Sequence, residues 1–283
     1  MARRSLLFSP GDQPALLRKA PETGADGVIF DLEDAVAPDE KTTARDAVHE
    51  VLTDPAFDPD CEVCVRLDPV GAGAAADVAA VLDGDPRLDS VMLPKVSDAA
   101  DVTALGDLLA DHGAALSVLA IVESAAAVLA AEDIARADPT DALVFGAEDL
   151  AVDIGAARSV EGGETMYARQ RVVLAASAAG VDALDSIHAD IEDTEGLAAD
   201  ATTARRLGFD GKVAIHPDQI PVINDAFTPP AERVEWAERV LEASEAAAAE
   251  GRGVVRVDGE MVDAPVVARA ERVLELARAG DDR

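Results

Sequence analysis

The sequence predicts an α/β fold, a (β/α)8 TIM barrel with a C-terminal helical extension, and three observations support this. Short apolar runs of strand length recur along the chain, and most are followed by a helical pattern. Strand and helix alternate at a spacing of roughly 25–35 residues, as in repeated parallel βα units. The length of 283 residues suits one barrel plus an extension. A doubly wound open sheet is the alternative, but polar residues at nearly every strand end favour the barrel, in which all these ends meet.

The predicted strands are apolar runs that end in polar or charged residues, as expected for buried parallel strands. They are Leu6–Asp12, Val28–Asp34, Val63–Asp68, Val91–Lys95, Leu119–Ser124, Leu143–Asp149, the weaker Val181–Ile187, and Val213–Pro217. Helical patterns lie between them, and one opens with proline in its first turn. The predicted helices are Pro14–Thr23, Pro38–Leu52, Ala74–Leu82, Asp98–His112, Ala125–Arg136, Thr165–Ala179 and Thr194–Leu207. Residues 1–227 are therefore expected to form the catalytic barrel.

Residues 228–283 form a separate region in this interpretation. Thr228-Pro229-Pro230 interrupts the chain, and helices are predicted at Ala231–Glu250 and Ala264–Ala279. This region is longer than a barrel needs for closure. We expect it to act as a lid, as an oligomerisation segment, or as both.

The composition restricts the class of partner. The chain has 56 acidic residues against 24 lysines and arginines, a formal net charge of −32. Because the acids are spread over helix faces, a halophilic surface is favoured over a site for basic partners. No basic stripe is present to bind nucleic acid. No apolar stretch has the length of a membrane span or a signal peptide, so a soluble, cytoplasmic protein is expected.

Cys61 and Cys64 form a C-x-x-C sequence. A zinc site would need two further ligands, and the chain has no second C-x-x-C or H-x3-H pattern to supply them. We interpret both residues as reduced cysteines that pack in the interior.

Charged residues at the strand ends outline a candidate active site. Asp34, Arg66, Glu123 and Asp149 are expected to face one pocket, because the carboxyl ends of barrel strands converge. Glu123 and Asp149 suit an octahedral Mg2+ site completed by water and substrate oxygens, although they could equally be solvated loop acids. Arg66 could clamp a carboxylate or an oxyanion, or form a core ion pair with Asp31 or Asp34.

Several longer strings resemble one family. RSLLFSPGD, VIFDLEDAVAPDEK, VRLD, MLPK, IVES, VFGAEDLA, GFDGKVAIHPDQI and DGEMVDAP look like the citrate lyase beta subunit-like proteins of the HpcH/HpaI aldolase superfamily. This group includes malyl-CoA, citramalyl-CoA and citryl-CoA lyases. The resemblance covers almost the whole chain, from Arg4 to about Arg272.

The resemblance implies a trimeric or hexameric TIM barrel that uses Mg2+, or alternatively Mn2+, on CoA thioesters. It implies that Glu123 and Asp149 bind the metal and that Arg66 stabilises an enolate. Asp263 in M-V-D-A-P would act as general acid/base in the site of a neighbouring subunit. The resemblance also places CoA-binding groups at the following residues: Arg4, Lys19, Ile215, His216 and Pro217.

The sequence departs from the family pattern at two places. Asp68 stands where the family usually has asparagine, and Ser124 and Ala127 occupy a segment that usually contains glycine. The favoured reaction is cleavage of malyl-CoA or β-methylmalyl-CoA to glyoxylate and acetyl- or propionyl-CoA. The alternatives are hydrolysis of malyl-CoA to malate and CoA, and service as a citryl or citramalyl lyase subunit.

Overall fold

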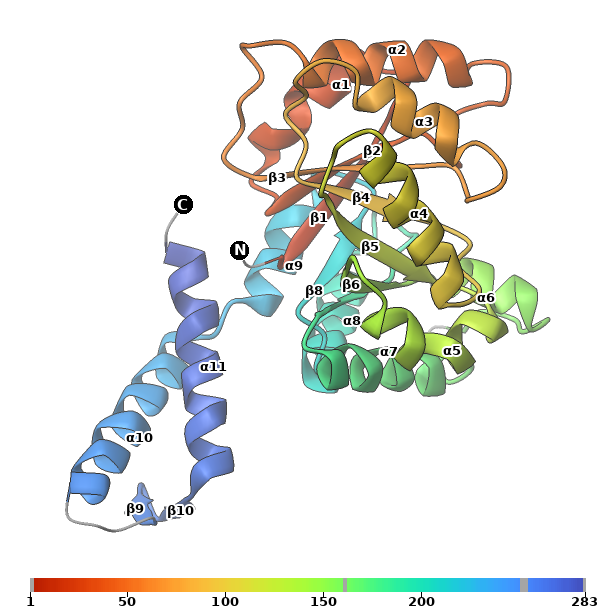
Figure 1. Ribbon diagram of the computed structural model, residues 1–283. Coiled ribbons are helices and arrows are strands. Elements are labelled where there is room, and N and C mark those ends of the chain that lie inside the picture. Colours follow the sequence, from red (N-terminus) through yellow and green to blue (C-terminus); the bar gives the residue numbers. More distant parts are fainter. Residues whose placement is uncertain (1–2, 160–161, 250–253, 282–283) are drawn as a thin grey trace. The chain divides into compact units, whose positions relative to one another are not determined.

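Eight parallel strands close into a barrel in chain order, which confirms the predicted fold class (Figure 1). The computed structural model describes residues 3–159, 162–249 and 254–281. The barrel strands are β1 Ser5–Pro10, β2 Gly27–Asp31, β3 Glu62–Arg66, β4 Ser90–Leu93, β5 Ser117–Val122, β6 Thr140–Phe145, β7 Asp182–Asp185 and β8 Gly211–Ala214. Each overlaps one of the eight predicted strands. β1 pairs with β8 through the register Leu6 with Val213, which closes the ring.

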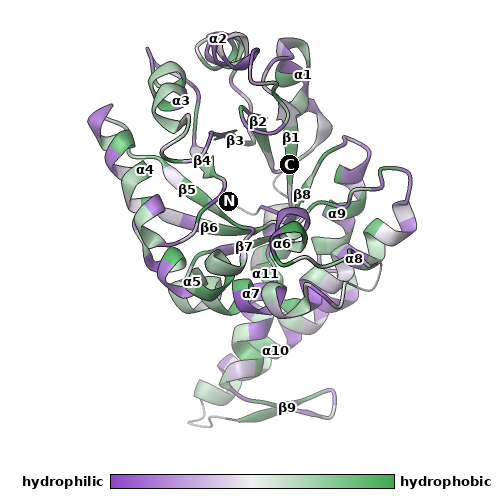
Figure 2. Cartoon of the chain, turned by 90° about the vertical axis from the view of Figure 1, so that its right-hand side faces the viewer, coloured by the Kyte–Doolittle hydropathy of each residue, from purple (hydrophilic) through white to green (hydrophobic). Residues whose placement is uncertain are grey.

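Helices surround the barrel on the outside (Figure 2). They are α1 Pro14–Lys19, the short 3-10 helix η1 Ala20–Thr23, α2 Lys41–Leu52, α3 Ala74–Val81, α4 Ala99–Asp111, α5 Ala125–Arg136, α7 Met166–Ala179 and α8 Thr194–Leu207. Local chemistry sets several of their ends. Asp98 forms a capping box at the start of α4, and Gly180 and Gly208 adopt the left-handed conformation at the ends of α7 and α8.

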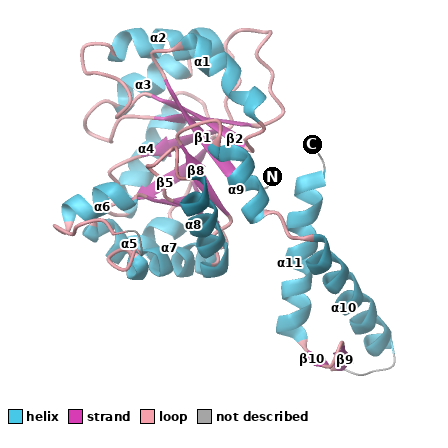
Figure 3. Ribbon diagram, turned by 180° about the vertical axis from the view of Figure 1, so that it is seen from behind, coloured by secondary structure: helices cyan, strands magenta, loops and turns pink. Residues whose placement is uncertain are grey.

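Two further helices, α6 Ala147–Asp153 and α9 Gln219–Phe227, were not predicted (Figure 3). α6 is short and follows β6 directly, so its residues are easily taken for the end of the strand. The helix α2 begins at Lys41 rather than at the predicted Pro38. The amide of Glu40 bonds to the carbonyl of Ala37 at 2.9 Å, so a turn precedes the helix.

The barrel interior is filled by aliphatic side chains on alternate positions of the strands. The interior cluster comprises Leu6, Ile29, Cys64, Met92, Leu119, Ile121, Ala142, Val144, Leu184 and Val213. Cys61 and Cys64 are both buried and not disulfide-bonded, as expected for packing cysteines. Among the described residues, no helix is both long and apolar enough to cross a bilayer.

The chain divides into two compact units, residues 3–224 and residues 225 onward, and the boundary falls within α9. The second unit contains α10 Ala231–Ala249, the antiparallel pair β9 Val255–Val257 and β10 Glu260–Val262, and α11 Ala264–Asp281. Ala237, Val240, Val262 and Ala270 form its buried core. The predicted end of the first tail helix at Glu250 lies outside the described residues.

Candidate active site

A cavity of about 450 Å³ opens at the carboxyl ends of the barrel strands. Its floor is apolar, and its polar lining comes from strands that are far apart in the sequence. The lining includes Phe8, Ser9, Asp31, Asp34, Arg66, Ile121, Glu123, Val144, Gly146, Asp149, Ser186, Val213 and Ile215. The four residues predicted to share a pocket, Asp34, Arg66, Glu123 and Asp149, are all among them.

Arg66 is the last residue of β3, and Asp31, the last residue of β2, holds its guanidinium with two hydrogen bonds. Arg66 Nε and Nη2 donate to the two carboxylate oxygens of Asp31 at 2.7 and 2.6 Å. This fork-to-fork pairing fixes the plane of the guanidinium. Arg66 Nη1 lies 3.1 Å from Glu33 and 3.9 Å from Asp34. Arg66 is therefore both a core ion-pair partner and a cation on the cavity wall.

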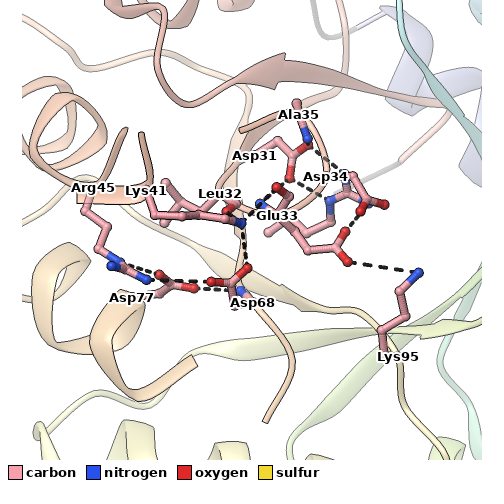
Figure 4. Close-up of polar contacts among 11 residues, drawn as sticks. Asp31, Leu32, Glu33, Asp34, Ala35, Lys41, Arg45, Asp68, Asp77 and Lys95 are labelled. Carbon is pink, nitrogen blue, oxygen red and sulfur yellow. Dashed lines mark hydrogen bonds and ion pairs between the residues drawn. The ribbon is translucent and has the colours of Figure 1, made fainter. Parts of the chain in front are cut away.

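The turn after β2 also fixes the orientation of the Asp31 carboxylate (Figure 4). The backbone amides of Glu33 and Ala35 donate to the Asp31 carboxylate at 2.9 and 3.1 Å. With two backbone and two guanidinium donors, the carboxylate of Asp31 is saturated and cannot rotate freely. The turn thereby sets the direction in which Arg66 points.

Glu123 directly follows β5 and is buried, with its carboxylate in a defined position. Its Oε1 accepts the backbone N–H of Lys95 at 2.6 Å. A Cβ placed on Gly146 would lie 3.0 Å from Oε2 and 2.5 Å from Cβ of Glu123. Because position 146 is glycine, β6 can approach Glu123 closely and space remains beside Oε2.

Asp149 lies in the first turn of α6, and its neighbour Glu148 points to different partners. The ammonium of Lys95 lies 3.0 Å from Asp149 Oδ1 and 3.6 Å from Glu123 Oε1, so one cation brings the two carboxylates together. Glu148 instead pairs with Arg158 at 2.9 Å. The structure thus separates two adjacent acids that the sequence could not tell apart.

Lys95 is a site residue that sequence reasoning did not assign. It follows β4 in the left-handed conformation, at a φ of 55°, which is uncommon for residues other than glycine. This conformation directs its N–H to Glu123, while its ammonium faces Asp149. A signal was available, because Lys95 ends a predicted strand and is one of only four lysines in the chain.

The site carries more negative than positive charge. Ion pairs with Arg66 and Lys95 link five carboxylates: Asp31, Glu33, Asp34, Glu123 and Asp149. Burial raises the pKa of Glu33 to about 7, against the opposing effect of the Arg66 charge. Burial likewise raises the pKa of Glu123 to about 7. Burial alone would raise the pKa of Asp149 too, but its hydrogen bond with Lys95 holds that pKa below the usual range.

Glu123 and Asp149 are suited to hold a divalent cation. Both present carboxylate oxygens, the donor type that Mg2+ prefers, and the surplus of negative charge favours a cation there. Among the described residues, no group of three or more His, Cys, Asp or Glu could hold a metal ion. The remaining coordination positions would therefore belong to water or substrate, as is usual for Mg2+ in enzymes.

The CoA-binding positions that the resemblance implied lie in different parts of the barrel. Ile215 lines the cavity, and the amides of Ile215 and His216 donate to the buried Gln219 at 2.9 and 3.3 Å, which holds this turn at the cavity mouth. Pro217 continues the same turn, and Lys19 is exposed at the end of α1.

The structure places Arg4 away from this cavity, within the same barrel unit. Arg4 immediately precedes β1, so it lies at the opposite end of the barrel from Arg66. It is buried there, and its guanidinium pairs with Asp26 at 2.9 Å. This placement does not suit contact with a ligand in the cavity. Asp263 belongs to the second compact unit, between β10 and α11.

The departures from the family pattern have structural roles. Asp68 Oδ1 accepts from Lys41 at 2.7 Å, and Asp68 Oδ2 lies 3.6 Å from Arg45. The extra carboxylate is thus paired with two cations of α2. Ser124 caps α5 by accepting the amide of Ala127 at 3.1 Å.

Comparison with known proteins gives consistent matches. The profile of the HpcH/HpaI aldolase/citrate lyase family matches residues 4–217. The chain is 42% identical to the citrate lyase subunit beta-like protein of Mycobacterium tuberculosis, over 97% of this chain and 95% of that protein. It is 36% identical to citrate lyase subunit beta of Leuconostoc mesenteroides, over 98% and 94% of the two chains. It is 33% identical to the mitochondrial citramalyl-CoA lyase of Rattus norvegicus, over 97% and 86%.

A solved structure is similar over its full length. The protein CitE from Mycobacterium tuberculosis, in complex with magnesium, acetoacetate and coenzyme A, superposes with a TM-score of 0.82 at 41% sequence identity. The match covers 98% of each chain. The same protein in complex with magnesium and pyruvate gives a TM-score of 0.74 at 36% identity, over 96% of this chain and 98% of that one.

Proposed function

The chain belongs to the HpcH/HpaI aldolase/citrate lyase family, and we propose that it is a Mg2+-dependent lyase that cleaves a carbon–carbon bond in a 3-hydroxyacyl-CoA thioester. The proposal rests on one observation: Arg66, Glu123 and Asp149 line the same cavity. Cleavage of this kind needs a cation at the hydroxyl and carboxylate oxygens of the substrate and a donor at the thioester oxygen. In the cavity, Glu123 and Asp149 would hold such a cation, and Arg66 is the donor.

Magnesium fits this cavity. The backbone N–H of Lys95 fixes Glu123 Oε1, and Glu123 Oε2 lies beside Gly146, which has no side chain. Asp149 lies beside the ammonium of Lys95. When bound, Mg2+ would supply positive charge to the substrate hydroxyl and carboxylate oxygens. The structures of CitE with magnesium support this assignment.

The side chains of the protein would perform the remaining steps. The hydroxyl group loses its proton, the bond to the thioester α-carbon breaks, and the electron pair becomes an enolate. Arg66, held rigidly by Asp31, is a preorganised donor for the enolate oxygen. Asp263, contributed by a neighbouring subunit of a homotrimer or homohexamer, would take the hydroxyl proton and return one to the enolate carbon. The products are an oxo acid and a shorter acyl-CoA.

For the substrate, we propose malyl-CoA or β-methylmalyl-CoA, which would give glyoxylate and acetyl- or propionyl-CoA. Citramalyl-CoA shares the same hydroxy-carboxylate head and differs from malyl-CoA by a methyl group. A single methyl group changes specificity by only about 1–3 kcal/mol in an apolar pocket, so the three esters belong in one test.

The test is incubation of the purified protein with each ester in high salt, with Mg2+ or with EDTA. An oxo acid together with an acyl-CoA supports the lyase. Malate or its analogue together with free CoA thiol would instead indicate a thioesterase. Turnover only with an acyl carrier protein would indicate a subunit of a larger lyase, in line with the relatives named citrate lyase subunit beta. Absence of turnover with any of these would refute the proposal.

A pair of neighbouring acids gives a matched control. Asp149→Asn should reduce turnover and Mn2+ affinity, because Asp149 lies beside Glu123 and Lys95. Glu148→Gln changes the charge by the same amount at a neighbouring residue that also lines the cavity but whose side chain pairs with Arg158. It should stay close to wild type. Equal effects of the two variants would contradict the assignment of Asp149 to the metal.

A further inference from the structure

Lys41, the first residue of α2, is bound to the loop after β2, which follows Asp31, and to the loop after β3, which follows Arg66 (Figure 4). Its ammonium donates to the carbonyl of Leu32, to the carbonyl of Glu33 at 2.9 Å, and to Asp68 Oδ1 at 2.7 Å. An ammonium has three donors, and here each has an acceptor. Two acceptors belong to the turn after β2, and the third lies two residues after Arg66, the last residue of β3.

This turn determines the position of Arg66. The amides of Glu33 and Ala35 fix Asp31, which in turn holds Arg66 with two hydrogen bonds. Lys41 binds the carbonyl sides of the same short segment. A chain of hydrogen bonds therefore runs from Lys41 through the turn to Asp31 and Arg66, although Lys41 does not line the cavity.

Lys41 and Arg45 are paired with acids that do not line the cavity. The charge of Lys41 therefore does not balance the carboxylates of the cavity. Asp68 is shared by Lys41 and Arg45, and Arg45 Nε donates to the fully buried Asp77 at 2.6 Å. The amide of Asp68 also donates to Asp77, at 2.6 Å. Arg45 thus belongs to the same ionic group but makes none of the contacts to the Leu32 and Glu33 carbonyls.

We propose that Lys41 is a positioning residue for the reaction: by tying the Leu32 and Glu33 carbonyls to Asp68, it holds the turn in the shape that aims Arg66 at the developing enolate. This inference rests on the proposed lyase function for its kinetic consequence, but not for its structural one. Without the ammonium, two carbonyls lose their donor and the turn is free to relax. A misplacement of about 1 Å at a reacting group can cost about 100-fold in rate.

The experiment compares Lys41→Met, Lys41→Arg and Arg45→Met in the full-length protein in high salt. Lys41→Met should lower kcat about 10- to 100-fold and change KM less than about threefold, because Arg66 acts on charge that develops in the transition state. Lys41→Arg keeps the charge but distributes its donors over a planar fork, so it should recover part of kcat. Arg45→Met removes the same charge from the same ionic group and should keep kcat within about threefold of wild type.

Hydrogen exchange supplies a readout that is independent of turnover. In Lys41→Met the amides of Glu33 and Ala35 should exchange at least about tenfold faster than in wild type, while in Arg45→Met they should not. Equal kcat and equal exchange in Lys41→Met and Arg45→Met would overturn the proposal, as would wild-type kcat in Lys41→Met. If the wild-type protein turns over none of the esters, the lyase proposal fails, and the exchange measurement alone decides whether Lys41 holds the turn.

Discussion

Replacing Gly146 by alanine gives a direct test of the proposed metal site. The new Cβ would lie 2.5 Å from Cβ of Glu123 and 3.0 Å from its Oε2, whereas ordinary contacts begin at 3.4 Å. Cβ of Glu123 cannot rotate away, because its position is set by the backbone after β5. The two strand ends must therefore separate by about 0.9 Å to reach an ordinary carbon–carbon contact.

A displacement of this size exceeds what magnesium coordination tolerates. Mg2+ requires oxygens at about 2.0–2.1 Å, and a ligand position is useful only within about 0.2 Å. We expect Gly146→Ala to weaken Mn2+ or Mg2+ binding about 10- to 100-fold, which corresponds to about 1.4–2.7 kcal/mol. Overpacking should also lower the free energy of unfolding by about 1–3 kcal/mol. Isothermal titration calorimetry with Mn2+ and thermal unfolding would measure the two effects.

The matched control is Gly163→Ala, because a Cβ on Gly163 meets no atom within 4 Å. This control should retain the wild-type metal affinity and melting temperature. Wild-type Mn2+ affinity in Gly146→Ala would refute the reasoning, since it would mean that Glu123 does not bind the metal or that the strand ends move without affecting it.

Three further predictions follow from other parts of the molecule. Asp263→Ala should abolish turnover while far-UV circular dichroism stays unchanged; retained activity would exclude the acid/base role. Lys212 is fully buried and lies 3.0 and 2.6 Å from Asp185 and Asp200, so Lys212→Met should cost about 3–5 kcal/mol in urea unfolding at neutral pH. Burial alone would raise the pKa of Asp200, but Lys212 holds it below the usual range. Because the pKa of Asp200 is lower in the folded protein, its ionised form stabilises the fold at pH values above the pKa of the unfolded chain. This stabilisation is lost as the pH falls through the pKa of the folded protein. The difference in free energy of unfolding between wild type and Lys212→Met should therefore shrink below about pH 4. Finally, the net charge of −32 predicts unfolding when salt falls from molar concentration to below about 0.1 M, because screening weakens; an unchanged circular dichroism spectrum at low salt would contradict a halophilic surface.

Apolar periodicity was sufficient to predict the barrel. Runs such as Leu119–Ser124 have the length and burial of a strand, and β5 occupies most of that run. Helical patterns are equally local, and the predicted start of α5 at Ala125 and the predicted end of α7 at Ala179 agree with the structure. The helix α6 was missed because it follows β6 after a single residue, Gly146, and seven residues give too short a period to recognise.

The candidate site could be predicted only in part. Because parallel strands of a barrel converge at one end, strand-end residues such as Arg66 and Glu123 could be grouped without knowing any distance. Lys95 also ends a predicted strand and could have been grouped with them, but its contact with Glu123 could not be predicted, since it depends on a left-handed backbone that directs its N–H at Glu123. The role of Asp68 was equally hidden, because Lys41 approaches it from a helix that precedes it by 27 positions.

Apolar runs, turn chemistry and strand direction are local properties of the chain, so they were enough to predict the fold class and to group the charged strand ends in one pocket. The family was recognised from longer strings such as VIFDLEDAVAPDEK. The partner of each charge became known from the tertiary structure alone. Arg66 is bound by Asp31, Asp149 faces Lys95 while Glu148 faces Arg158, and Arg4 lies at the far end of the barrel with Asp26. Ion pairing depends on distances of a few ångströms between residues that are far apart in sequence. Closure of the barrel sets these distances, and a local sequence pattern does not predict them.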